Sequence, residues 1–172
     1  MTGEIHEDVH PFATPMEHRD PVRRFRGRLA EPVTVITAGD DEDRAGMTVS
    51  SLVVAEGEPG RVQFLAAPTA DLVDVIERTG RFIVHVLESE HRAISEVFAE
   101  QRPSPGGLFA GLAVEDGEWG PALTDVPNRA YCSGASAAES GYSLLITADI
   151  DHVAIAALED PLIYFRGAYR QI

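Results

Sequence analysis

The spacing of apolar residues changes several times along this chain, and each change predicts a different element. Val22, Phe25 and Leu29 lie three and four residues apart, which is the spacing of one helical face. A short amphipathic helix is therefore expected after Pro21, leading into the rest of the chain.

Two later segments have the same helical spacing. After Pro68 the pattern predicts a core helix that ends at Gly80, with Thr69 as its N-cap and Asp71 in its first turn. The apolar face of this helix comprises Leu72, Val73, Val75 and Ile76. A second core helix is expected over residues 90–100, with an apolar face made of Ala93, Ile94, Val97 and Phe98.

Short β-branched or apolar runs between turn-rich segments predict strands. Residues 81–87 are apolar almost throughout, which indicates a strand that is buried on both faces. The other strands are expected over residues 32–37, 47–54, 61–66, 113–119, 129–138, 144–155 and 162–172. Many short strands with two or three helices between them favour a mainly β fold, an antiparallel barrel with helical inserts.

The chain has 172 residues, which suits one domain, and we expect that domain to span residues 21–172. Residues 1–20 carry acidic groups, histidines and prolines with few apolar anchors, so they are expected to form a mobile or loosely draped arm. His6 and His10 lie four residues apart in this arm without a third ligand, so no metal site is expected there.

Charge and composition narrow the classes of partner. The chain has 28 acidic and 14 basic side chains, a formal net charge of −14, so binding to nucleic acid or to an anionic membrane surface is not expected. No apolar run approaches the roughly 20 residues that span a bilayer, and the N-terminus lacks the pattern of a secretory signal. Cys132 is the one cysteine, which fits a reducing compartment, and a cytoplasmic location is expected.

The one basic cluster lies in the first predicted helix. Arginines in this cluster could attract a phosphate or pair with an acidic surface, although a solvated helix face is the simpler interpretation. The cluster comprises Arg23, Arg24, Arg26 and Arg28.

Residues 46–51, Gly-Met-Thr-Val-Ser-Ser, are the first candidate for binding chemistry. Small residues and hydroxyls in succession allow backbone amides and side chains to approach a flat polar ring closely. The alternative is that the hydroxyls of Thr48, Ser50 and Ser51 merely alternate on a half-buried strand.

The order of several short segments resembles the flavin reductase-like family. These segments are residues 32–37, residues 46–51, Arg78 to Leu87 (RTGRFIVHVL), Phe98–Ala99, Gly107–Phe109 and Pro161 to Arg170 (PLIYFRGAYR). The resemblance covers roughly residues 22–172, and the ordered set is more specific than any one of its parts.

The resemblance implies an antiparallel split β-barrel that binds FMN or FAD and works as a homodimer. It implies hydride transfer from NAD(P)H to the flavin, in some members as the reductase component of a two-component monooxygenase. The cofactors then supply the reactive atoms, so no catalytic side chain is expected. The alternative is a split barrel that binds flavin or deazaflavin without NAD(P)H turnover.

The resemblance also implies a set of cofactor-binding positions. The flavin ring would contact Met47, Thr48, Val49, Ser50 and Ser51. The ribityl chain and phosphate would lie beside Ala66, Ala67, Pro68, Thr69 and Asp71. Further cofactor contacts are expected from His85 and Phe98. Tyr142 could stack on a ring as an aromatic platform, and the alternative is that it caps a strand at the surface.

The sequence departs from the family pattern at the expected phosphate and nicotinamide positions. Ala70 and Leu72 stand where hydroxyl residues are usual, and Asp71 places a carboxylate in the same turn. Tyr142 and Ser143 replace an Asp-His pair, which raises the question of NAD(P)H use. His85 replaces a frequent Asn, and a lone histidine in an apolar strand is more often a hydrogen-bonded core residue than a ligand.

Overall fold

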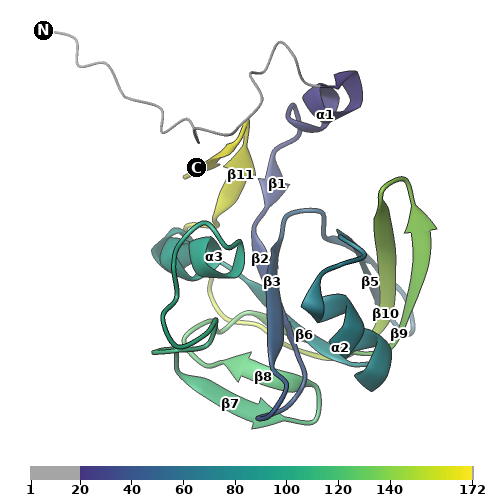
Figure 1. The fold of residues 1–172 in the computed structure, drawn as a ribbon, viewed down its shortest axis with the longest axis vertical. Coiled ribbons are helices and arrows are strands. Elements are labelled where there is room, and N and C mark those ends of the chain that lie inside the picture. Colours follow the sequence, from purple (N-terminus) through teal and green to yellow (C-terminus); the bar gives the residue numbers. More distant parts are fainter. Residues whose placement is uncertain (1–19, 172) are drawn as a thin grey trace, which may run out of the picture.

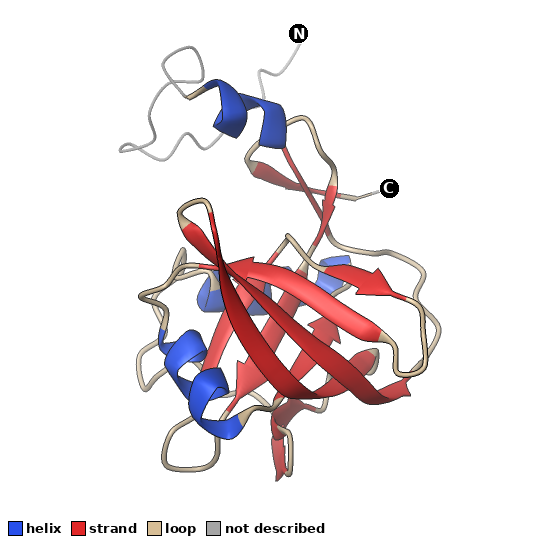
Figure 2. Cartoon of the chain, turned by 90° about the vertical axis from the view of Figure 1, so that its right-hand side faces the viewer, coloured by secondary structure: helices blue, strands red, loops and turns tan. Residues whose placement is uncertain are grey.

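The computed structural model describes residues 20–171 and has one strongly curved antiparallel sheet at its centre (Figures 1 and 2). The strand order in this sheet is β3-β2-β6-β9-β10-β5-β4. Its strands are β2 (Thr34–Ala38), β3 (Ala45–Val49), β4 (Val53–Ala55), β5 (Arg61–Ala66), β6 (Phe82–Val86), β9 (Arg129–Ser140) and β10 (Ser143–Ala154).

The two edges of this sheet converge because its edge strands are consecutive in the chain. Only residues 50–52 separate β3 from β4, so three residues connect opposite edges of the seven-stranded sheet. The sheet is therefore bent almost into a closed cylinder, which confirms the predicted mainly β fold and antiparallel split barrel.

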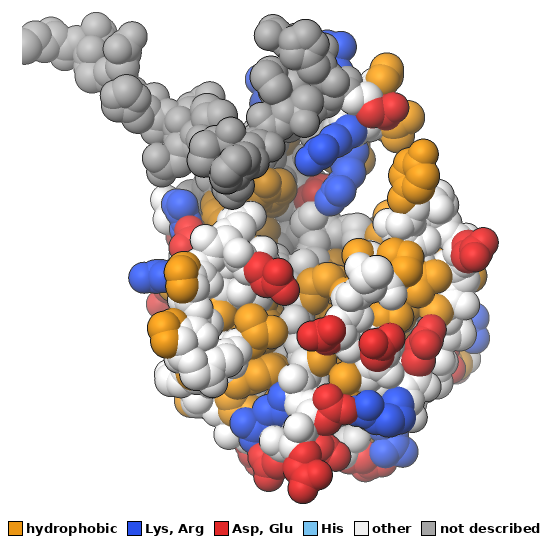
Figure 3. Space-filling view, viewed as in Figure 1, with side chains coloured by type: hydrophobic (Ala, Val, Ile, Leu, Met, Phe, Trp, Pro, Cys, Tyr) orange, Lys and Arg blue, Asp and Glu red, His pale blue; other side chains and the backbone are white. Residues whose placement is uncertain are grey.

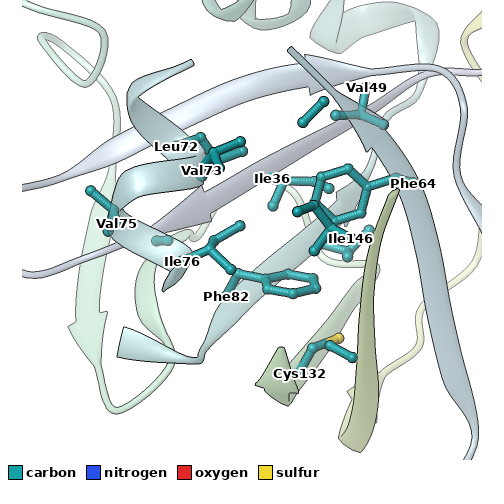
Figure 4. Close-up of a cluster of buried hydrophobic side chains, with 14 of the residues drawn as sticks. Ile36, Val49, Phe64, Leu72, Val73, Val75, Ile76, Phe82, Cys132 and Ile146 are labelled. Carbon is teal, nitrogen blue, oxygen red and sulfur yellow. The ribbon is translucent and has the colours of Figure 1, made fainter. Parts of the chain in front are cut away.

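Helix α2 (Asp71–Thr79) fills one side of the barrel. Its buried face packs against aromatic and aliphatic side chains from the strands, among them Phe64 and Phe82, whose rings meet edge to face at 5.5 Å (Figure 4). The cluster has side chains from every main-sheet strand except β4. Burial of this apolar surface stabilises the barrel.

A second apolar cluster lies beneath the short helices η2 (Ser89–His91) and α3 (Arg92–Phe98) and the hairpin of β7 (Val114–Gly117) with β8 (Gly120–Leu123). Its buried members are Val33, Val35, Leu87, Phe98, Leu123, Val126 and Leu162. A small separate sheet is formed by β1 (Glu31–Pro32), β11 (Ile163–Phe165) and β12 (Ala168–Arg170).

Several predicted boundaries were wrong. The strand expected over residues 47–54 is two strands, β3 and β4, because the chain must cross between sheet edges at residues 50–52. The N-cap of α2 is Ala70, not Thr69, and no side chain caps the helix. Ala93 is exposed rather than part of the buried face of α3.

The predicted amphipathic helix exists as α1 (Pro21–Arg26), but it buries no residue. Val22 and Phe25 are 75% and 70% exposed, and both views show α1 standing off from the barrel (Figures 1 and 2). Asp20, expected to be part of the arm, caps α1 by accepting hydrogen bonds from the Val22 and Arg23 amides. The rest of the predicted arm, with His6 and His10, lies outside the described residues.

Within residues 20–171, no helix is both long enough and apolar enough to cross a membrane.

Gly46 has a packing role in the fold. A Cβ atom at this position would lie 2.4 Å from Cε1 of Phe98 and 3.2 Å from the carbonyl oxygen of Ile36. The Phe98 ring is 1% exposed and meets the Phe109 ring edge to face at 5.2 Å, so it has little room to move. The absence of a side chain at residue 46 is what allows α3 to pack closely on β3.

His85 lies on β6 and is fully buried. Its Nδ1 is 3.1 Å from the carbonyl oxygen of Val35, and its Nε2 accepts a hydrogen bond from the Leu123 amide at 3.0 Å. This arrangement fits a neutral ring protonated on Nδ1. The pKa of His85 is lowered to about 3, mainly by burial; the Val35 carbonyl opposes this shift, and the nearby Arg129 charge contributes to it.

We expect Gly46→Ala to lower the free energy of unfolding by about 1 to 3 kcal/mol, because the added methyl group overlaps the Phe98 ring. Chemical denaturation would measure the change. Gly27→Ala is the matched control, since Gly27 has a φ of −66° and its Cβ would meet nothing closer than 3.6 Å. Equal stabilities for Gly46→Ala and the wild type would contradict this account of Gly46.

We expect acid to destabilise the protein through His85. The unfolded state binds a proton on this ring near pH 6.5 and the folded state only near pH 3, so stability is complete above pH 6.5 and falls as the pH drops toward 3. Between pH 7 and 5.5 the loss from this residue should be about 1 kcal/mol. The His85→Gln variant should show a correspondingly shallower pH dependence of its unfolding free energy, and an unchanged slope would refute this role.

Candidate functional site

Thr48, near the end of β3, uses its hydroxyl inside the protein. Its Oγ1 donates a hydrogen bond to the Ser95 carbonyl oxygen at 2.7 Å, which ties β3 to α3. Met47 and Thr48 are partly exposed, whereas Val49 is buried in the first apolar cluster. The Thr48 hydroxyl is therefore already used, and a ligand at this strand would contact its backbone and its small exposed side-chain surface.

Ser50 forms a polar cluster with two residues from the N-terminal part of the chain. Its Oγ donates to Oε2 of Glu31 at 2.6 Å, and Nη2 of Arg26 reaches the same Ser50 oxygen at 3.5 Å. Nε of Arg26 lies 3.4 Å from Oε1 of Glu31. The cluster connects the segment after α1 to the connection between β3 and β4.

Ser51 joins the two segments that were expected to hold the flavin. Its Oγ accepts a hydrogen bond from the Leu65 amide at 2.9 Å and lies 3.4 Å from the Leu65 carbonyl oxygen. Leu65 immediately precedes the segment that leads into α2, so residues 47–51 and 66–71 lie side by side. Sequence spacing alone did not predict this connection.

The segment from Ala66 to Asp71 offers small side chains and few donors. Ala66 is buried, and Ala67, Pro68 and Thr69 are exposed. Asp71 is also exposed, and with Asp74 it places two carboxylates in the first turn of α2. Two negative charges already compensate the positive end of the helix dipole, which makes this helix start a poor site for a phosphate.

Tyr142 is fully exposed at the tip of the β9–β10 hairpin. Leu144 pairs with Ala66 in the sheet, so the hairpin tip lies beside the end of β5 and the residues that follow it (Figure 1). The backbone of the hairpin tip therefore lies near the 66–71 segment, and the exposed Tyr142 ring is free to contact a planar ligand.

Three of the predicted groups thus come together at one end of the barrel: residues 47–51, residues 66–71 and Tyr142. The face seen in Figure 3 is hollowed below α1, between that helix and the body of the barrel. His85 and Phe98 are not part of this surface, because both side chains are buried in the core. We leave these two residues out of the proposed site.

Sequence reasoning missed Glu31, Leu52 and Leu65 as neighbours of the site. Leu52 packs partly buried against the first cluster, and Glu31 has only 14% of its side chain exposed. The contact of Arg26 with Ser50 was not predicted either, because nothing in the sequence connects these two residues. The sequence indicated only that a basic cluster lies in this helix.

The residues at this end of the barrel are better suited to binding a flat ring than to covalent catalysis. Hydroxyls in residues 47–51 already have protein partners, and the surface between them is formed by small side chains and backbone. Among residues 20–171, no cluster of three or more histidine, cysteine or acidic side chains is arranged to hold a metal ion. The arrangement can bind and orient a flat aromatic group.

Comparison with known proteins agrees with this geometry. The chain matches the family model described as "flavin reductase like domain" over residues 26–172. It is 32% identical to the NADH-dependent FMN reductase AsuE2 of Streptomyces nodosus subsp. asukaensis, over 88% of this chain and 83% of the relative. It is 30% identical to the reductase component of 4-hydroxyphenylacetate 3-monooxygenase of Thermus thermophilus, over 90% and 97% of the two chains.

The comparison with solved structures shows the same fold. The solved structure of the flavin reductase PheA2 in its native state superposes with a TM-score of 0.79, at 24% identity, over 90% of this chain and 99% of that chain. With most of its length matched by the family model, the chain belongs to the flavin reductase-like family.

Proposed function

We propose that this protein is a flavin reductase that transfers a hydride from NADH or NADPH to FMN or FAD. The observation that carries the proposal is the Ser51–Leu65 connection, which sets the expected ring-binding strand beside the segment before α2. Family membership supplies the reaction, because the Streptomyces relative is named an NADH-dependent FMN reductase.

The residues at the end of the barrel would hold the flavin by shape. Residues 47–51 form a wall whose hydroxyls are fixed by internal bonds, so its backbone can meet the ring edge without rearrangement. Ala67 and Pro68 are exposed and present no bulky polar side chain beside that wall. When bound, the flavin supplies the ring that accepts the hydride, and this chain supplies stacking and orientation.

Tyr142 is the proposed contact for the nicotinamide nucleotide. Its exposed ring at the hairpin tip can stack on a second planar group, which would hold the hydride donor against the flavin. Support for this role is its position beside the 66–71 segment, which follows from the pairing of Leu144 with Ala66.

We also propose that the reduced flavin is delivered to a separate monooxygenase. Support comes from the Thermus thermophilus relative, which is named as the reductase component of such an enzyme. The match covers 97% of that relative, so nearly all of its length has a counterpart here.

A homodimer is the proposed assembly. One chain alone leaves large apolar side chains uncovered on α1 and on β4, the edge strand next to the site. A six-residue helix that buries nothing gains too little from its own hydrogen bonds to be stable in isolation. A second copy would cover Val22, Phe25, Val53 and Val54.

The first test is a flavin spectrum followed by NADH titration. Purified protein mixed with excess FMN should bind flavin, seen as quenching of flavin fluorescence, and should oxidise NADH or NADPH only when flavin is present. The control omits the protein. Flavin binding without nicotinamide oxidation would favour the alternative function, a flavin- or deazaflavin-binding barrel, and absence of both would refute the proposal.

The second test concerns the assembly. Light scattering coupled to size-exclusion chromatography should give twice the chain mass, and Phe25→Asp should raise the dimer dissociation constant about tenfold or more. Phe25→Leu, which keeps an apolar side chain, is the control. A wild-type protein that is monomeric at every concentration would rule out the homodimer.

A further inference from the structure

The start of α2 lacks what a flavin phosphate needs. Ala70 and Leu72 carry no hydroxyl, the N-cap makes no side-chain bond, and Asp71 and Asp74 would repel a dianion. Thr69 is the one hydroxyl residue in this turn. If the proposed flavin function holds, as the inference below assumes, a positive group elsewhere at the site would offset the repulsion by Asp71 and Asp74.

Arg26 is the cation in position to do so. Within residues 20–171, it is the one arginine with a hydrogen bond to any of the expected flavin-binding residues, through Nη2 and the Ser50 hydroxyl. The other arginines that form ion pairs do so elsewhere, for example Arg61 with Asp149 and Arg78 with Asp43. Figure 3 shows basic side chains below α1 at the edge of the hollow.

The guanidinium of Arg26 is held along one edge and free along the other. Nε faces Glu31 and Nη2 faces Ser50, at 3.4 and 3.5 Å, while the side chain as a whole is 63% exposed. A guanidinium has five N–H donors, so at least three remain for a ligand. Phosphate oxygens match this planar fork better than any other common anion except a carboxylate.

Glu31 orients the guanidinium of Arg26 and does not prevent it from binding an anion. The Glu31 side chain is 14% exposed, and both of its oxygens are engaged, one by Arg26 and one by Ser50. Contacts of 3.4 and 3.5 Å on an exposed arginine are long for charged hydrogen bonds, so the guanidinium can shift toward an incoming anion at low cost.

We propose that Arg26 binds the phosphate of the flavin, in the role that hydroxyl residues at the start of α2 cannot perform here. Glu31 and Ser50 hold it at the end of the 47–51 segment, next to Ser51, which is bonded to the residue that precedes the 66–71 segment. Arg26 is then a determinant of specificity for phosphorylated flavins over riboflavin, which has the same ring and ribityl chain without the phosphate.

The test compares the affinities of FMN and riboflavin, measured by flavin fluorescence quenching, in the wild type and in Arg26→Gln. We expect the wild type to bind FMN at least tenfold more tightly than riboflavin. In Arg26→Gln the affinity for FMN should fall about tenfold to a hundredfold, with riboflavin affinity unchanged. Arg26→Lys, which keeps the charge without the fork, should fall between the two.

Arg24→Gln is the matched control, since it removes the same charge from the same exposed helix two residues away, on a different face. It should leave both affinities unchanged. Equal wild-type affinities for FMN and riboflavin would overturn the proposal. Equal losses for both ligands in Arg26→Gln, or the same FMN loss in Arg24→Gln, would also overturn it. Failure of the wild type to bind either flavin would instead overturn the proposed function itself, and this inference with it.

Discussion

The burial of α2 against the open side of the barrel is the contact on which the rest of the structure depends. A curved sheet that does not close needs side chains from outside the sheet to fill it, and α2 supplies Leu72, Val73 and Ile76. Because α2 follows β5 after only four residues, its docking fixes the path of residues 67–70 across the end of the barrel. The candidate site is formed where this path meets the end of β3.

Hydroxyl groups at this site hold the protein together. Thr48 is bonded to α3, Ser50 to Glu31 and Ser51 to β5, so each ties a different neighbour to the same short segment. A wall fixed in this way can present its backbone to a flat ring without paying an ordering cost on binding. Recognition of charge would then fall to groups outside the wall, which is the role proposed for Arg26 of α1.

Sequence predictions were more accurate for features that depend on neighbouring residues than for features that depend on contacts between distant segments. The strand at residues 61–66, the left-handed Gly80 that ends α2 and the doubly buried β6 depend on local spacing, and the structure confirms them. A continuous strand over residues 47–54 was wrong because the crossing at residues 50–52 depends on how distant strands pair. Thr69 as N-cap was also wrong, although a cap is a local feature. His85 could be assigned to the core only once Val35 and Leu123 were seen at its two nitrogens.

The sequence by itself determined the mainly β barrel, the helix that fills it and the family, because apolar periodicity and the order of short motifs are properties of the chain alone. Tertiary structure decided which side chains of residues 46–51 are exposed and which of their hydroxyl groups already have protein partners. It alone brought Arg26 to Ser50, 24 residues away, and Tyr142 beside the end of β5. Such contacts depend on sheet register and on the crossing between sheet edges, neither of which the spacing of residues specifies.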